Sequence, residues 1–191
     1  RSLSALGGAV SSLELIDKTE ASVALNERLK HELQAEMANY HGCRTRTDGK
    51  DAAQTAPDYT TGIEPVFWNE RWITFLQRTS GYCGGAYPFS GFSYTTWDLT
   101  SGKKIILDTW LDQSESSRSR LNKIIAGKAV KQRLALYPQE AREENNCLAV
   151  IRENTTYELS LRKKGMVFSS TFPHAMQACD DNIEIPYSEL S

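Results

Sequence analysis

The first half of the chain carries an apolar stripe with a helical period. Leu25, Leu29, Leu33 and Met37 recur every four residues, and the positions between them are mostly charged or amide side chains. This spacing places the apolar residues on one side of a helix, and we predict a helix over residues 18–40. Asp17 followed by Glu20 resembles a capping box at its start.

A second helix is predicted over residues 116–137. Leu121, Ile124 and Ile125 mark one side of it, and Pro138 ends it because proline disfavours helical geometry in the residue before it. Gly127 lies within this helix, where it permits a bend or close packing on a sheet. Residues 141–146 are predicted to end a short helical turn.

Segments rich in aromatic and β-branched residues, or with alternating polarity, predict the strands. Three hairpins are expected, with turns at Asn69-Glu70, at Thr100-Ser101-Gly102 and at residues 162–165. A strand near residues 13–16, a last strand at 183–185 and a terminal helical turn after Pro186 complete the pattern. The paired segments are 64–68 with 71–79, 92–99 with 103–107, and 157–161 with 166–168.

These elements predict an α+β fold, in which two main helices pack on an antiparallel β-sheet and disulfides staple the structure. The chain of 191 residues is long enough for one core, so we expect a single module over residues 1–191. The polar stretch 42–61 is the one place where a weak subdomain boundary is expected.

Composition and charge exclude several classes of function. A formal net charge of -2 gives no electrostatic reason to bind nucleic acid. No apolar run approaches the roughly 20 residues of a membrane span. The chain begins at Arg1, as a domain trimmed of a signal peptide or an upstream anchor would, so its start point is no evidence about targeting.

The four cysteines are spaced too widely for a structural zinc site. They are either buried thiols or two disulfides, and the Gly-rich turn at Cys83 favours disulfides. Of the three possible pairings we prefer the one in which Cys43 joins Cys83 and Cys147 joins Cys179. Each bond would then close a loop of roughly 30 to 40 residues and contribute about 4 kcal/mol.

Catalytic and cofactor signatures are not found in the sequence. His31, His41 and His174 lack the spacing of a zinc site, and Gly84-Gly85 lacks the lysine of a phosphate-binding loop. We therefore expect no metal, no cofactor and no catalytic residue. The alternative is a hydrolase that acts on cell-wall glycan through an unrecognised pair of carboxylates. The acids considered for it are Asp108, Asp112, Asp180 and Asp181.

Aromatic residues gather around the Cys83 turn. Because rigid aromatic side chains gain contact area at a small entropic cost, they make good anchors for a partner. The alternative is a buried aromatic cluster beneath the sheet. The candidate binding residues are Tyr82, Tyr87, Phe89 and Phe92, with Tyr94 in the same group.

Three groups of residues resemble a known bacterial family. They are the turn from Cys83 to Pro88, the run Thr96-Trp97-Asp98-Leu99-Thr100-Ser101-Gly102-Lys103 followed by Leu107-Asp108-Thr109-Trp110, and the C-terminal Ile185-Pro186-Tyr187-Ser188-Glu189-Leu190. The order of these groups along the chain is similar to that in the extracytoplasmic domain of unknown function shared by lysozyme-sensing anti-sigma factors and the N-terminal region of peptidoglycan deacetylases. Members commonly carry histidine where this chain has Tyr87.

The resemblance implies a non-catalytic, extracytoplasmic cell-envelope domain, either periplasmic or an outer-membrane lipoprotein. In the anti-sigma factors this region binds lysozyme, so a protein such as lysozyme or a peptidoglycan fragment is the expected partner. The deacetylase chemistry of the family belongs to a different domain. A purely structural lipoprotein domain is the remaining alternative.

Overall fold

The computed structural model describes residues 2–5, 8–16, 19–47, 58–84, 87–141 and 146–190. They form two compact units, Arg1–Ile105 and Ile106–Ser191. The single module expected from the sequence remains a prediction.

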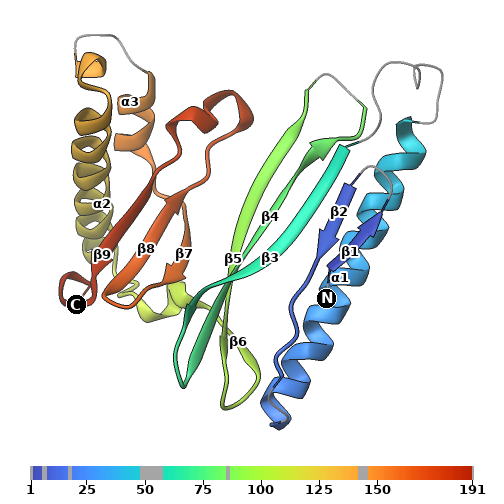
Figure 1. Cartoon of the computed structure of the whole chain (residues 1–191). Helices are drawn as coiled ribbons and strands as arrows, with labels where there is room; N and C mark the ends of the chain where they lie inside the picture. The colour runs from blue at the N-terminus through green and yellow to red at the C-terminus, as the bar shows by residue number, and fades with distance from the viewer. Residues whose placement is uncertain are drawn as a thin grey trace. The chain divides into compact units, whose positions relative to one another are not determined.

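The first unit combines one long helix with a six-stranded sheet (Figure 1). Its strands lie in the sheet in chain order, from β1 to β6. The elements are β1 (Ser2–Ala5), β2 (Gly8–Ser11), α1 (Glu20–Thr47), β3 (Asp58–Trp68), β4 (Trp72–Tyr82), β5 (Phe89–Asp98) and β6 (Lys103–Ile105).

One pair of strands in this sheet is parallel. β2 runs parallel to β3, and the other neighbouring pairs are antiparallel. The chain leaves β2, passes through α1 and returns to β3, and a crossover of this kind makes a parallel pair possible. The sheet is therefore mixed, whereas the sequence predicted antiparallel pairing throughout.

The apolar stripe of α1 packs on the sheet, as its period predicts. Leu25 and Leu29 form a buried cluster with Ile73, Phe75 and Trp97 from β4 and β5. The helix extends to Thr47, beyond the predicted end at residue 40.

The start of α1 is capped by Thr19. Its Oγ1 accepts a hydrogen bond from the Ser22 backbone N–H at 3.2 Å, which satisfies one of the free donors of the first turn. Asp17, the predicted cap, lies outside the described residues.

The predicted strand at residues 13–16 is wrong, since this segment is irregular and the strand lies earlier, in β2. The side chain of Asn26 explains the difference. Its Oδ1 accepts from the Leu15 N–H at 2.8 Å and its Nδ2 donates to the Leu15 carbonyl at 2.9 Å. Leu15 thus pairs its backbone with a helix side chain instead of a neighbouring strand.

Both predicted hairpins of the first unit are confirmed, although β3 and β4 are longer than expected. The Asn69 Oδ1 accepts from the backbone N–H groups of Arg71 and Trp72 in the β3–β4 turn. In the β5–β6 turn, the Asp98 carboxylate accepts from Thr100 N at 2.7 Å, and Gly102 takes a φ of 65°.

The second unit places helices beside a three-stranded antiparallel sheet of order β7-β8-β9 (Figure 1). Its strands confirm the predicted third hairpin and last strand. The elements are η1 (Leu107–Trp110), α2 (Glu115–Leu136), η2 (Pro138–Ala141), α3 (Asn146–Glu153), β7 (Tyr157–Leu161), β8 (Gly165–Ser170), η3 (His174–Cys179), β9 (Asn182–Pro186) and η4 (Tyr187–Glu189).

The core of this unit lies between its helices and its sheet. Ala129 of α2, Ile151 of α3 and Phe168 and Ile183 of the sheet line one cavity of only about 10 Å³. The helix α3 was not predicted. Its apolar residues Cys147, Leu148 and Ile151 are buried, but the helix has only eight residues, which are too few to show a helical period in the sequence.

Both predicted disulfides are confirmed. Cys43 bonds to Cys83 with a Cα–Cα distance of 4.7 Å, and Cys147 bonds to Cys179 with a Cα–Cα distance of 5.1 Å. Each bond lies within one unit. The α+β class with two disulfides is thus as predicted, with a second sheet and a third helix in addition.

No helix in the described part of the chain has the length and apolar character needed to cross a membrane.

Candidate functional site

The four candidate binding residues lie in the first unit, near the end of β4 and the start of β5. Tyr82 is the last residue of β4, and Phe89 is the first residue of β5. Tyr87 lies in the connection between them, and Phe92 lies further along β5. The structure therefore brings all four to one region, beside the Cys43–Cys83 disulfide.

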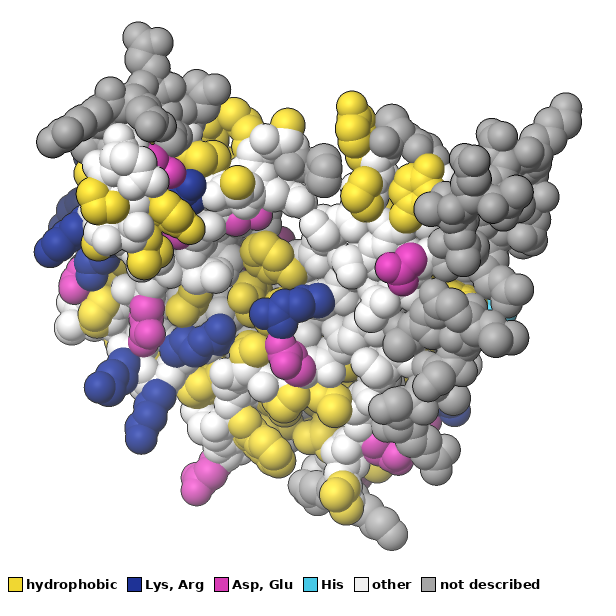
Figure 2. All heavy atoms as spheres, turned by 45° about the horizontal axis from the view of Figure 1, so that its top comes forward, with side chains coloured by type: hydrophobic (Ala, Val, Ile, Leu, Met, Phe, Trp, Pro, Cys, Tyr) yellow, Lys and Arg dark blue, Asp and Glu magenta, His cyan; other side chains and the backbone are white. Residues whose placement is uncertain are grey.

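Two of these side chains are open to solvent. Tyr87 is 74% exposed and Phe89 is 37% exposed, whereas Tyr82 and Phe92 are half-buried. Figure 2 shows hydrophobic side chains on the surface where the β4–β5 hairpin comes forward. A fully buried aromatic cluster, the alternative considered from the sequence, does not describe Tyr87.

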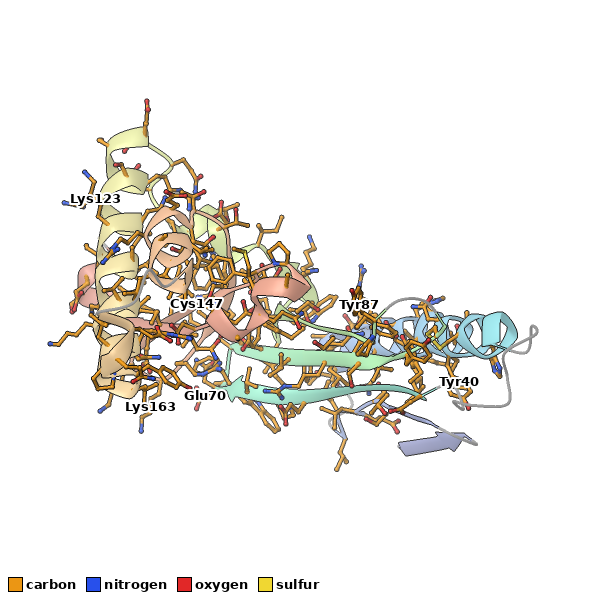
Figure 3. The ribbon with its side chains drawn as sticks, turned by 90° about the horizontal axis from the view of Figure 1, so that it is seen from above. Tyr40, Glu70, Tyr87, Lys123, Cys147 and Lys163 are labelled. Carbon is orange, nitrogen blue, oxygen red and sulfur yellow. A yellow bond between two sulfur atoms is a disulfide. The ribbon has the colours of Figure 1, made fainter. Side chains whose placement is uncertain are left out.

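Phe89 ends a row of aromatic rings that leads into the unit. Its ring lies 5.8 Å from that of Tyr59 on β3, and the Tyr59 ring lies 6.2 Å from that of Tyr40 on α1. The Tyr40 and His41 rings follow at 5.5 Å. Tyr40 and Tyr59 are buried, so the exposed Phe89 rests on a packed base (Figure 3 labels Tyr40 and Tyr87).

The hydroxyl of Tyr59 is held by α1. It donates a hydrogen bond to the Glu36 carboxylate, whose other oxygen accepts from the Gln77 amide at 2.9 Å. Burial raises the pKa of Tyr59, and the hydrogen bond to Glu36 raises it further. Tyr59 thus stays neutral and acts as a donor, which fixes the base beneath Phe89.

Phe89 and Phe92 point to opposite faces of the sheet. Side chains alternate along a strand, so residues three positions apart lie on different faces. Phe89 contacts Tyr59, whereas the Phe92 ring packs edge to face with that of Tyr94 at 5.7 Å. A flat partner surface therefore cannot contact both Phe89 and Phe92. A partner that contacts both must wrap around the edge of β5.

The Cys43–Cys83 disulfide ties the C-terminal part of α1 to the residue that follows β4. Gly84 follows with a φ of 78°, a backbone conformation that favours glycine. The connection that carries Tyr87 therefore starts from a covalently held point.

The base residues Tyr40, Tyr59 and Glu36 were missed from the sequence. Tyr59 lies in the polar stretch that the sequence assigned to a loop, and the sequence pattern gives no sign of its pairing with α1. The sequence offered one signal, the i, i+4 spacing of Glu36 and Tyr40, which places both side chains on the same side of the predicted helix.

The four acids of the hydrolase alternative all lie in the second unit and serve local structure. The Asp108 carboxylate accepts from Arg118 at 2.6 Å, and the Asp112 carboxylate accepts from Ser117 Oγ at 2.6 Å. The Asp180 carboxylate accepts from the Phe172 N–H at 2.8 Å, and Asp181 accepts from Gln132.

Electrostatics divide these acids into two kinds. Hydrogen bonds from Ser117 and Ser114 lower the pKa of Asp112. Burial raises the pKa of Asp180 and of Asp181. Raised pKa values also occur at purely structural sites, so these two acids do not by themselves indicate catalysis.

The three histidines lie on two elements. His31 and His41 both lie on α1, and His174 begins η3. Among the described residues no group of three or more His, Cys, Asp or Glu side chains is arranged to hold a metal ion.

No known protein family and no curated protein matches this sequence. A solved structure of a DUF3298 family protein from Pseudomonas aeruginosa PAO1 has a similar fold, with a TM-score of 0.58 and 14% identity, covering 87% of this chain and 77% of that chain. A solved structure of a DUF3298 family member from Bacteroides fragilis matches at a TM-score of 0.45 and 17% identity, covering 91% of this chain and 68% of that chain.

The first likeness shows a shared fold. At the level of fold it supports the predicted resemblance to a bacterial domain of unknown function. A specific link to anti-sigma factors or deacetylases is a matter for proposal.

Proposed function

We propose that this chain is a non-catalytic extracytoplasmic domain of the cell envelope, periplasmic or lipid-anchored, that binds a protein such as lysozyme or a peptidoglycan fragment. The binding surface is the aromatic group Tyr82, Tyr87, Phe89 and Phe92. Tyr87 and Phe89 are its centre.

The exposure of Tyr87 and Phe89 beside the Cys43–Cys83 disulfide is the observation that carries this proposal. Large exposed aromatic side chains are costly to leave in water, and they dominate binding energy where a partner covers them. The ordered base of Tyr59 and Tyr40 limits the motion of Phe89, so little side-chain entropy is lost on binding.

The proposed compartment follows from the cysteines. All four are paired in disulfides, and disulfides persist in oxidising compartments such as the periplasm. The sequence resemblance to an extracytoplasmic family supports the same location.

Retention on the immobilised domain tests the function. We expect either hen lysozyme or purified muropeptides to be retained, and the Tyr87→Ala and Phe89→Ala variants to weaken binding by about 2 kcal/mol each. Both side chains lie at the protein surface, so the variants are expected to fold.

Trp68→Ala is the matched control. Trp68 is also a largely exposed aromatic residue, at 66%, but it lies at the β3–β4 turn, at the far end of β4 from Tyr82. Its loss should leave binding unchanged. If neither ligand is retained, or if Trp68→Ala has the same effect as Tyr87→Ala, the proposed surface is wrong.

A further inference from the structure

An open groove runs along α2 in the second unit, away from the aromatic surface. It has a volume of about 630 Å³, within the range of small-molecule sites. One wall is a face of α2 from Glu115 to Val130, and the other is the end of α3 and the residues after it. Its polar lining includes Ser119, Asn122, Lys123, Arg152, Asn154 and Thr155.

The groove carries an excess of positive charge. Lys123 and Arg152 line it from opposite walls, and neither forms an ion pair with a described carboxylate. Arg118 is paired with Asp108, and Glu115 is the only acid among the described lining residues. Figure 2 shows Lys and Arg side chains on the side where α2 lies, and Figure 3 shows Lys123 pointing outward from α2.

Gly127 lines the groove without a side chain. Glycine inside a helix is unfavourable, so its presence there calls for a reason. The fold supplies none, because a Cβ at this position would have no heavy atom within 4 Å. The close packing on the sheet that the sequence suggested for Gly127 is therefore wrong.

The rest of the lining limits the chemistry of a ligand. Amide and hydroxyl side chains can both donate and accept hydrogen bonds, which suits a ligand with several hydroxyl groups. The helix backbone itself offers a ligand no hydrogen bonds here, because the N–H and C=O groups in the middle of a helix are already paired. Lys123 and Arg152, which have no ion-pair partner among the described carboxylates, suit a carboxylate ligand.

We propose that this groove binds an acidic saccharide, with the sugar ring over Gly127 and Ala126 and the carboxylate between Lys123 and Arg152. The amide and hydroxyl groups of the walls hold the ring hydroxyls. This site is independent of the aromatic surface, and either can fail without the other.

Amide NMR spectra of the oxidised full chain test the proposal with three probes. They are glucuronic acid, glucose, which lacks its carboxylate, and acetate, which lacks its ring. We expect glucuronic acid to shift the amide signals of residues 115–130 and 152–155 and to bind at least about tenfold more tightly than either other probe, since a charged hydrogen bond is worth about 1.5–3 kcal/mol.

Substitutions then locate the binding. Lys123→Met and Arg152→Gln should each weaken the glucuronic acid affinity about tenfold, which corresponds to the loss of one charged contact. Gly127→Leu should remove binding by filling the groove, and it should fold because the site is open and leucine favours a helix. Lys131→Met is the control, since Lys131 lies on the same helix and does not line the groove.

Three results would overturn the proposal. They are no shift with glucuronic acid, equal binding of acetate or glucose, or equal weakening by Lys131→Met and Lys123→Met. Should a variant fail to fold, the glucuronic acid affinity of the unmodified chain is measured at increasing ionic strength. The affinity must fall if cations hold the carboxylate, and a constant affinity would overturn the proposal.

Discussion

At the scale of single residues, two glycines of the second unit differ in whether the structure requires them, although the sequence does not distinguish them. Gly127 and Gly165 are both glycines inside regular elements. A Cβ on Gly165 would lie 2.2 Å from the Ile185 carbonyl oxygen on β9, whereas a Cβ on Gly127 would meet open space. One glycine is required by strand packing and the other is not.

Gly127→Ala is expected to stabilise the protein by about 0.5–1 kcal/mol, because alanine costs less backbone entropy in a helix. Gly165→Ala is expected to destabilise it by about 1–3 kcal/mol through steric conflict with β9. Urea unfolding followed by circular dichroism measures both. A loss of stability in Gly127→Ala would show that the α2 face is covered.

Single residues with shifted pKa values also make the stability of the protein depend on pH. Burial raises the pKa of Asp181, and the Arg133 charge only partly opposes it. The folded state therefore holds a proton that the unfolded state releases, and stability falls as pH rises from the ordinary aspartate pKa of 3.8 through the raised value. Asp181→Asn should therefore stabilise the protein at pH 7 and have little effect near pH 3.

Asp112→Asn is the control of opposite sign. Hydrogen bonds from Ser117 and Ser114 lower the pKa of Asp112, so its contribution is present above pH 3.8 and is lost as pH falls. This variant should be less stable than the unmodified chain at pH 7. Urea titrations at pH 3, 5 and 7 compare the two, and a matching sign in both variants would contradict the assignment.

At the scale of elements, the disulfides join segments that meet only through the fold. One ties the C-terminal part of α1 to the end of β4, and the other ties α3 to the end of η3. The buried pair Arg133 and Glu140 reinforces the second region. The Arg133 guanidinium donates to both Glu140 carboxylate oxygens, at 2.9 and 3.0 Å, and to the Ala178 carbonyl at 2.7 Å.

Removal of either disulfide should destabilise its unit. The bonds span 40 and 32 residues, for which the chain-entropy estimate is about 4 kcal/mol each. The double variants Cys43→Ala/Cys83→Ala and Cys147→Ala/Cys179→Ala test this by calorimetry. Thiol labelling of the denatured, non-reduced chain is the complementary check, and any labelled sulfur would contradict the bonding.

At the scale of the whole molecule, the chain is divided into two compact units. Each has its own sheet, its own helix packing and its own disulfide. The two proposed binding sites are divided in the same way. The aromatic surface belongs to the first unit and the groove along α2 to the second.

We expect the oxidised fragment 106–191 to fold by itself, because α2, α3 and the β7–β9 sheet enclose a core within it. Dispersed amide NMR signals and a cooperative thermal transition would show this. An unfolded spectrum would instead favour the single module predicted from the sequence. The full chain, measured under the same conditions, is the reference.

Local patterns were enough to identify most elements of this protein. The stripe from Leu25 to Met37, Pro138 and the Thr100-Ser101-Gly102 turn each act through neighbouring residues, so the sequence records them directly. The preferred one of the three disulfide pairings is also the one that the structure contains.

Long-range contacts account for what the sequence could not supply. The parallel pairing of β2 with β3, the bonding of Asn26 to Leu15 and the base of Tyr40 and Tyr59 beneath Phe89 each join residues far apart in the chain. No periodicity encodes such pairs, since each depends on where α1 comes to lie against the sheet. Aromatic residues near Cys83 could be named beforehand, but their exposure and their separation onto two faces arise from packing.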